Sequence, residues 1–309
     1  MRILLTGTGG QVGGALLPLL QHSDQVLAPS REEFDLSHPD ELKERLARYQ
    51  PDLIINPAAY TSVDRAEEER ELAFRVNAEA PAIMVEWAVR NGVPLVHFST
   101  DYVFDGSGSE PWREDSEPRP LSVYGKSKLA GERAIVAAGG AHIIVRTSWI
   151  YAASGINFLN TIANLAKERE ELRIVADQIG APTTARVIAV TLTKILSARR
   201  TELTCAFEEW GGALNIACQG ETSWYGFATA IAAGLRCRGV GLNAKNIIPI
   251  ETNEFPTRAK RPQNSRLNLE RLFNVFGIVT PDWYEALQGE LDAYSGFSLG
   301  VDGNGPWTG

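Results

Sequence analysis

The sequence contains few of the residues that build disulfide frameworks or metal centres. Its 309 residues include only three cysteines and four histidines. The cysteines Cys205, Cys218 and Cys237 show no Cys-x-x-Cys spacing, and the histidines are scattered along the chain. We therefore expect reduced, buried structural thiols and no metal site.

Long apolar runs are also missing. The N-terminal segment Met1–Gly7 reaches glycine after a few apolar residues, which is too short for the core of a signal peptide. No run approaches the roughly 18 apolar residues that a membrane helix needs. The sequence predicts a cytoplasmic protein with no membrane partner.

The chain also has no excess of basic residues. The chain has 30 Lys and Arg against 38 Asp and Glu, so its formal net charge is −8. This balance argues against a nucleic-acid partner or an anionic membrane surface. The length and the 44% hydrophobic content are typical of a globular chain with a substantial core, in one large or two ordinary domains.

Glycines are plentiful directly after the first expected strand, Arg2–Thr6. Gly7, Gly10 and Gly13 follow it in a Gly-x-x-Gly-x-x-Gly spacing, and an apolar helix then continues to about Leu20. Missing side chains let a pyrophosphate approach the backbone, and a helix N-terminus offers unpaired N–H groups. This segment, with Gln11 and Val12, predicts dinucleotide binding; a plain turn between strand and helix is the alternative.

The second expected strand, Gln25–Ala28, lacks a closing carboxylate. An acid there would bind a ribose 2′-hydroxyl, whereas Ser30 and Arg31 could accept a 2′-phosphate. We therefore favour NADPH as the cofactor, with NADH as the alternative. Asp35 and Leu36 are candidates for the edge of the adenine.

A third strand, Asp52–Asn56, has an apolar centre typical of a buried parallel strand. The residues after it include Ala58, Ala59 and Tyr60. The two alanines leave room for a flat cofactor over the strand tip, although a structural turn explains them equally well.

The fourth strand and the helix after it carry the candidate catalytic residues. Leu95–Phe98 ends in Ser99 and Thr100, and Tyr124 and Lys128 lie four residues apart on a helix expected at 122–137. A nearby ammonium lowers the pKa of a phenol, which would make Tyr124 a better proton donor. Thr100 would supply a second hydrogen bond to the same oxygen. Tyr-x-x-x-Lys spacing alone is common on helices, so the residues around the pair must show whether it is catalytic.

Strands and helices alternate through the first half of the chain. Helices at 39–49 and 78–90 and a fifth strand at 142–146 complete a pattern that predicts an α/β, Rossmann-type doubly wound parallel sheet over residues 1–150. The Pro-rich segment 110–120 is expected to be an exposed loop.

The second half predicts a smaller mixed α/β substrate-binding domain over residues 151–294. Helices are expected at 158–167, 187–197 and 224–236, and a strand at 213–217. The segment 185–217 is expected to return to the first domain. Residues 295–309 are glycine-rich and are expected to form a flexible tail.

Several motifs resemble one family. The chain resembles the extended short-chain dehydrogenase/reductase superfamily and, within it, the dTDP-4-dehydrorhamnose reductase family. The matching stretches are Gly7–Gly13, Asn56–Asp64, Ser99–Phe104, Tyr124–Glu132, Arg146–Trp149, Asp177–Thr183 and Arg261–Leu267. They span almost the whole chain.

The resemblance implies NADPH-dependent reduction of the carbon-4 ketone of dTDP-4-dehydro-β-L-rhamnose. It implies that Tyr124 protonates the oxyanion, that Lys128 holds the nicotinamide ribose and that Thr100 tunes the hydrogen bonding. Ser99 would lie at the cofactor. The residues implied on the substrate side are Thr100, Asp101, Tyr102, Val103, Phe104, Trp149, Asn157, Arg261 and Asn264.

A basic cluster closes the second half. Arg258, Lys260, Arg261 and Arg266 are its members. Such a run is usually solvated surface, but the resemblance places Arg261 or its neighbours at the diphosphate of the sugar nucleotide.

One departure limits the resemblance. Some relatives form a homodimer around Mg²⁺ held by glutamates, one of which follows the glycine loop, where this chain has Gly14-Ala15-Leu16. The resemblance therefore carries no Mg²⁺ requirement to this chain, and both a monomer and a homodimer stay open. Two other functions also stay open: another nucleotide-sugar oxidoreductase or epimerase of the superfamily, and a non-catalytic regulatory subunit of the methionine adenosyltransferase type.

Overall fold

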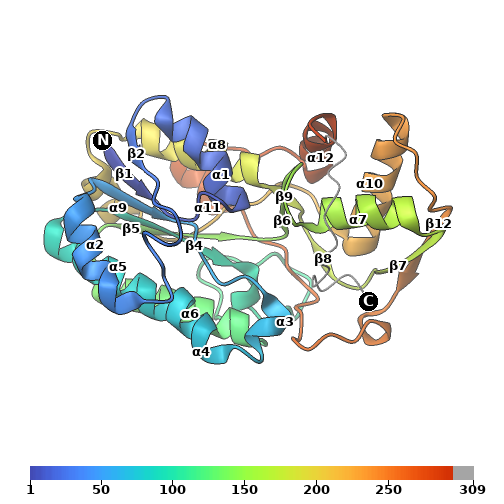
Figure 1. The fold of residues 1–309 in the computed structure, drawn as a ribbon, viewed down its shortest axis with the longest axis horizontal. Coiled ribbons are helices and arrows are strands. Elements are labelled where there is room, and N and C mark those ends of the chain that lie inside the picture. The colour runs from blue at the N-terminus through green and yellow to red at the C-terminus, as the bar shows by residue number, and fades with distance from the viewer. Residues whose placement is uncertain (295–309) are drawn as a thin grey trace.

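A six-stranded parallel sheet forms the centre of the molecule (Figure 1). The computed structural model describes residues 1–294; the tail expected at 295–309 lies outside them. The sheet order is β10-β5-β4-β3-β1-β2, and every neighbouring pair is parallel. The strands are β1 (Arg2–Leu5), β2 (Gln25–Leu27), β3 (Leu53–Asn56), β4 (Leu95–Thr100), β5 (His142–Thr147) and β10 (Gly212–Asn215). This confirms the predicted doubly wound α/β fold.

Helices cover both faces of the sheet, which explains why its strands are apolar throughout. Ile3 and Leu5 of β1 face one core, and Leu4 faces the other. The first core packs against α1 (Gln11–Gln21), α8 (Ala185–Ala198), α9 (Leu203–Trp210) and α11 (Glu270–Phe276). The second packs against α2 (Leu42–Tyr49), α5 (Ala80–Asn91) and α6 (Val123–Ala138), on the opposite side in Figure 1.

The helix expected at 78–90 begins slightly later, because a π-helical turn, η2 (Arg75–Glu79), precedes α5. It ends where Gly92 adopts a left-handed conformation. Four short elements join this part of the chain: η1 (Pro39–Glu41), α3 (Val63–Ala66), α4 (Arg70–Phe74) and η3 (Asp101–Val103). The turn η3 starts directly at the end of β4.

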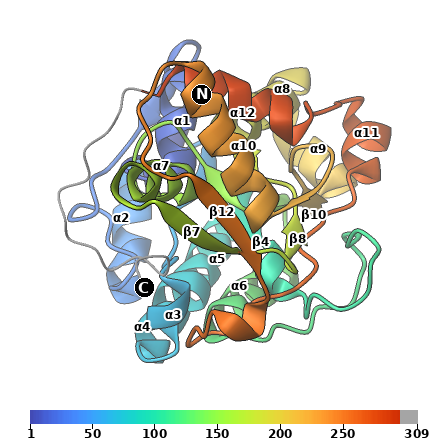
Figure 2. The same cartoon turned by 90° about the vertical axis from the view of Figure 1, so that its right-hand side faces the viewer.

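A third hydrophobic core lies beside the sheet, under α7 (Phe158–Glu168), α10 (Trp224–Cys237) and α12 (Trp283–Asp292). Figure 2 views this side of the molecule, with β7 (Glu171–Val175) paired in parallel with β12 (Asn246–Ile250). The remaining strands pair as β6 (Ile150–Tyr151) with β9 (Thr183–Thr184) and β8 (Ile179–Gly180) with β11 (Thr222–Ser223). The turn η4 (Thr252–Glu254) follows β12.

The strand β10 joins the central sheet from this later part of the chain, pairing with β5. All three cysteines are free, but only Cys218 is buried, so the expectation of buried thiols is wrong for Cys205 and Cys237. Within residues 1–294, no helix has both the length and the apolar character of a membrane span.

Candidate active site

The carboxyl ends of β1 and β3 meet at the point where the strand order reverses, which is where open α/β sheets bind their ligands. Gly7, just after β1, has φ +59° and packs against Ala58, just after β3. A Cβ on Gly7 would stand 2.9 Å from the Cα of Ala58. The structure therefore explains both small residues by the close approach of two chain segments.

The glycine loop closes tightly on itself before α1 begins. The N–H of Gly10 donates to the carbonyl of Gly7 at 2.9 Å, and a Cβ on Gly13 would overlap that same carbonyl. Gly10 caps α1 without a side-chain hydrogen bond, and a Cβ on Gly9 would meet no neighbour. Uncapped N–H groups beside open space fit the pyrophosphate of a dinucleotide. Val12 is buried in the core below the loop.

A carboxylate that the sequence reasoning missed lies after β2. The Ser30 N–H donates to Glu33 Oε2 at 2.8 Å, and the Glu33 N–H returns to Ser30 Oγ. Arg31 is largely exposed, 4.0 Å from Asp35, and Leu36 is buried in the core. No acid directly follows β2, as expected, but the Glu33 carboxylate further along the loop folds back onto Ser30.

The segment after β3 is fixed by a single asparagine. Asn77 Oδ1 accepts from the Tyr60 N–H at 2.9 Å, and its Nδ2 donates to Ser127 Oγ of α6 at 3.0 Å. The Tyr60 hydroxyl donates to Glu69. These bonds hold the residues Ala58–Tyr60 against the helix that carries Tyr124 and Lys128.

The helix α6 brings Tyr124 to Thr100. Ser122 caps the helix by accepting from the Gly125 N–H, and Tyr124 lies in the first turn. The Tyr124 phenol faces Thr100 at the end of β4. Burial raises the pKa of Tyr124, and the Thr100 hydroxyl only partly opposes this. The expectation that Lys128 lowers this pKa is not met in the described structure.

Lys128 lies one turn further into the core and is 2% exposed. Its Nζ is 3.2 Å from Nε2 of His97 in β4. Burial lowers the pKa of Lys128 to about 8, against the opposing influence of Glu132. Sequence reasoning treated His97 as part of an apolar strand; a histidine at its centre was the available signal.

Polar groups gather at the ends of β4 and β5. Asp101 accepts from the Thr100 hydroxyl at 3.0 Å, and burial raises the pKa of its carboxyl to about 6. Thr147 pairs with Thr100 across the sheet. Among the described residues, the buried hydroxyls of Thr147 and Ser99 find no hydrogen-bond partner. Such a set of unpaired polar groups suits a site that a polar ligand completes.

Trp149 follows β5 in a left-handed conformation, φ +47°, which is rare for a large side chain. Its ring stacks on Trp224, with centroids 3.6 Å apart, and a Cβ on Gly180 would stand 2.7 Å from it. Trp224 belongs to the third core, under α7, α10 and α12, as expected. Strained positions of this kind cluster at functional sites.

Four other expected site residues are held by the scaffold. Val103 and Phe104 are fully buried beside Leu129, which leaves their side chains no surface for a ligand in this arrangement. Asn157 caps α7 and bonds the carbonyl of Ala152. Asn264 donates to the Glu110 carbonyl.

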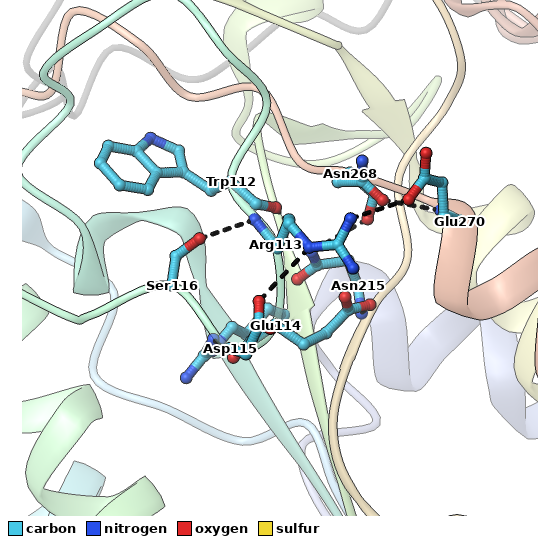
Figure 3. A network of polar contacts seen from close by, with 9 residues as sticks. Trp112, Arg113, Glu114, Asp115, Ser116, Asn215, Asn268 and Glu270 are labelled. Atoms are coloured by element: carbon cyan, nitrogen blue, oxygen red, sulfur yellow. Dashed lines mark hydrogen bonds and ion pairs between the residues drawn. The ribbon is translucent and has the colours of Figure 1, made fainter.

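The segment 110–120 is more firmly attached than an exposed loop (Figure 3). The Asn215 side chain of β10 donates to the carbonyls of Trp112 and Asn268, and the backbone N–H of Asn215 donates to the Glu114 carboxylate. The Trp112 ring stacks on Phe104, with centroids 4.7 Å apart. The loop between β4 and α6 is therefore anchored through Trp112 and Glu114.

Within the basic cluster, Arg261 has a buried side chain. Its guanidinium pairs with Asp64 at 2.6 Å, and its side chain is 6% exposed. Arg258 is exposed and pairs with Glu68, and Arg266 pairs with Glu221. Within residues 1–294 there is no group of three or more His, Cys, Asp or Glu side chains suited to a metal ion.

The doubly wound sheet, the glycine loop at its switch point and the threonine–tyrosine pair one strand away define a dinucleotide-binding α/β protein of the short-chain dehydrogenase/reductase type. The family model described as RmlD substrate binding domain matches residues 1–295. The chain belongs to this family, that of the dTDP-4-dehydrorhamnose reductases.

Three relatives illustrate the similarity. The dTDP-4-dehydrorhamnose reductase of Burkholderia thailandensis is 44% identical over 290 residues, covering 93% of this chain and 97% of the relative. The crystal structure of a Clostridium acetobutylicum dTDP-4-dehydrorhamnose reductase has a TM-score of 0.86 at 35% identity, covering 95% and 99%. The Bacillus anthracis dTDP-4-dehydrorhamnose reductase, solved in complex with NADP, has a TM-score of 0.84 at 33% identity, covering 94% and 99%.

Proposed function

We propose that this oxidoreductase reduces the carbon-4 ketone of dTDP-4-dehydro-β-L-rhamnose to the alcohol, giving dTDP-β-L-rhamnose, with NADPH as reductant. The placement of Tyr124 in the first turn of α6, facing Thr100 at the end of β4, carries the proposal, because it puts a phenolic proton donor at the carboxyl edge of the sheet. The family and its named relatives supply the substrate and the cofactor.

The residues Gly7, Gly10, Gln11 and Gly13 would hold the pyrophosphate, and Ser30 with Arg31 the 2′-phosphate. When bound, NADPH supplies the hydride that adds to the carbonyl carbon. The chain then supplies a proton to the carbonyl oxygen, so that one hydride and one proton convert the ketone to the alcohol.

Tyr124 is the proton donor in this proposal. A phenol is protonated at neutral pH and burial raises the pKa of Tyr124 further, so the proton is in place when the strongly basic oxyanion forms, although burial also makes the phenol a weaker acid. Thr100 lies beside the phenol and would donate to the same oxyanion by turning its hydroxyl away from Asp101. Lys128, one turn away, would bind the nicotinamide ribose.

The sugar nucleotide would lie between the sheet edge and the third core, under α7, α10 and α12. Asp101 and Trp149 stand at the ends of neighbouring strands, where they would contact the sugar. Tyr102 is packed edge-on against Tyr124 at 5.6 Å and would border the same space. Arg261 would meet the diphosphate by sharing its guanidinium with Asp64.

The presence of Thr100, Tyr124 and Lys128 in one arrangement favours an enzyme over a regulatory subunit. A small-molecule dTDP-sugar is the partner that this site requires. Whether the chain acts as a monomer or a homodimer does not enter the chemistry proposed.

The test is a substrate panel. Purified protein is mixed with NADPH and, in turn, dTDP-4-dehydro-β-L-rhamnose, other nucleotide 4-keto sugars and saturated nucleotide sugars, and cofactor consumption is followed. Consumption only with the 4-dehydrorhamnose nucleotide, with dTDP-β-L-rhamnose identified as product, supports the proposal. Tightly bound NAD and interconversion of saturated sugars would instead indicate an epimerase.

A further inference from the structure

A continuous chain of hydrogen bonds runs through the core from β1 to α6. The Thr6 hydroxyl, directly after β1, lies 2.6 Å from Oδ1 of Asn56 at the end of β3. Nδ2 of Asn56 lies 3.1 Å from Nδ1 of His97, and Nε2 of His97 lies 3.2 Å from Nζ of Lys128. None of the four side chains is more than 2% exposed. Both ring nitrogens of His97 are therefore engaged.

This chain of polar groups occupies a position where apolar side chains would be more stable. His97 lies between Val96 and Phe98 in a strand that is buried along its whole length. Burying a polar ring is unfavourable unless both nitrogens are bonded. The register of the sheet places Asn56 beside His97 and satisfies the inner nitrogen. The outer nitrogen is left to face Lys128.

The contact with Lys128 decides which nitrogen of His97 carries its proton. Burial and the nearby Lys128 lower the pKa of His97 well below its ordinary value, so the ring is neutral. A neutral imidazole has one donor and one acceptor nitrogen. An ammonium at Lys128 requires Nε2 to accept, and the proton then lies on Nδ1. An uncharged amine can accept from Nε2–H, and Nδ1 is then the acceptor.

Asn56 and Thr6 can follow either arrangement. In the structure, Asn56 donates to Nδ1 of His97 and accepts from the Thr6 hydroxyl. Turning the amide over exchanges its donor and acceptor with little change in shape. Oδ1 would then accept from Nδ1–H, and Nδ2 would donate to the Thr6 oxygen. A hydroxyl accepts as readily as it donates, so the hydrogen bonds can reverse their direction by the turn of one amide, with no shift of the backbone.

We propose that His97 is a positioning residue for Lys128, a neutral ring whose tautomer follows the charge of the lysine and so keeps a hydrogen-bond partner for it in both states. The fixed ring holds Nζ in place one turn from Tyr124. The inference rests on the proposed reductase function for the part that Lys128 plays in the reaction; the coupling between His97 and Lys128 does not depend on it.

Few other charged groups face Lys128. Glu132, one turn further along α6, is engaged by Arg146 of β5 at 2.6 Å. Asn77 of η2, which packs on the same helix, is neutral and bonds Ser127. The titratable groups nearest this part of α6 include His97 of β4, Asp101 and Tyr102 of η3, Tyr60 with Glu69 before α4, Glu67 after α3, and Tyr124 itself. The elements packed on α6 also carry Asp64 and Arg65 of α3, Arg70 and Glu71 of α4, and Arg75 and Glu79 of η2.

The direct test is nitrogen NMR of the imidazole rings in the protein without cofactor. The chain has only four histidines, so the His97 signals can be assigned by comparison with the His97→Gln variant. We expect His97 to pass from the Nδ1–H to the Nε2–H tautomer as pH rises through about 8, where Lys128 titrates, without becoming an imidazolium. In Lys128→Met, this transition should be lost. A fixed tautomer between pH 6 and 10, or an ordinary imidazolium titration, would overturn the inference.

A kinetic test measures whether His97 positions Lys128. His97→Leu removes the acceptor, and the alkaline limb of the kcat profile should move about one unit lower because the buried ammonium is less stable. His97→Gln keeps an acceptor oxygen and should restore much of that shift. Equal limbs in all three proteins, with matched thermal stability, would contradict the proposal.

The two hypotheses can fail separately. If the tautomer transition occurs but no keto sugar is reduced, the proposed function is wrong and the coupling stands. If reduction occurs but His97 keeps one tautomer, the coupling is wrong and the function stands.

Discussion

Gly125 faces the backbone carbonyl of Tyr102 so closely that a Cβ at position 125 would overlap its oxygen. This contact lets the first turn of α6 settle against η3 and brings Tyr124 to Thr100. The glycine between the tyrosine and the lysine is thus explained by packing, which spacing alone does not reveal.

Substituting Gly125 by alanine should therefore displace Tyr124. We expect Gly125→Ala to lower the free energy of unfolding by about 1–3 kcal/mol, as overpacking does. Turnover should fall about a hundredfold, because a shift of about 1 Å misaligns the donor. Gly241→Ala, at a site with open space, is the control and should change neither quantity. Normal turnover in Gly125→Ala would show that this contact does not position the phenol.

The buried carboxyl of Asp101 should make the stability of the fold depend on pH. Its pKa rises from 3.8 to about 6 on folding, so the folded state favours the protonated acid. The resulting stabilisation is complete below pH 4 and is lost as pH rises through 6. Asp101→Asn should therefore be more stable than the wild type at pH 8, by up to about 3 kcal/mol, and the difference should vanish near pH 4. Urea unfolding at several pH values measures it.

Asp105 is the control for Asp101, because folding shifts its pKa in the opposite direction. Hydrogen bonds from Ser107 lower the pKa of Asp105, so its contribution is present at neutral pH and is lost as pH falls. Asp105→Asn should therefore not stabilise the protein at pH 8. A gain in stability in both variants would attribute the effect to net charge instead of burial.

Glu33 should influence the choice of cofactor. Its carboxylate occupies the Ser30 N–H that a 2′-phosphate would use and adds a like charge beside it. We expect Glu33→Gln to tighten NADPH binding about fivefold, or about 1 kcal/mol, with NADH binding unchanged. Glu32→Gln, an exposed neighbour, is the matched control. Equal changes for both cofactors would place the 2′-phosphate elsewhere.

Arg261 has two separable effects. Arg261→Gln should raise KM for the sugar nucleotide more than KM for NADPH, and it should also destabilise the fold by breaking the pair with Asp64. Asp64→Asn breaks the same pair but keeps the guanidinium, so it should lower stability without the same rise in KM. If Arg261→Gln raises KM for NADPH more strongly, the assignment to the diphosphate is wrong.

The fold was largely predictable because its signals are local. Apolar strands with both faces covered, the glycines after β1 and the helix caps at Ser122 and Gly92 each act within a few residues. The family resemblance extended the prediction to the second half of the chain, where periodicity alone predicts helices but not their function.

The details that sequence reasoning missed depend on contacts between distant segments. Glu33 reaches Ser30 only because the loop after β2 turns back, and the buried His97 ring finds its hydrogen-bond partners in distant segments, at Asn56 and at Lys128, 31 positions later. The pKa of Tyr124 was predicted from the helical spacing of Lys128, but burial dominates it. Burial and long-range pairing are set by the folded chain and leave little trace in a local pattern.

The central claim is that Tyr124 delivers the proton, and one comparison tests it most directly. Wild type and Tyr124→Phe are assayed for NADPH consumption with dTDP-4-dehydro-β-L-rhamnose, and the affinity of each for NADPH is measured by titration. We predict a loss of turnover of at least about a hundredfold in Tyr124→Phe, with cofactor affinity largely retained. Near-normal turnover with bound cofactor would contradict the account.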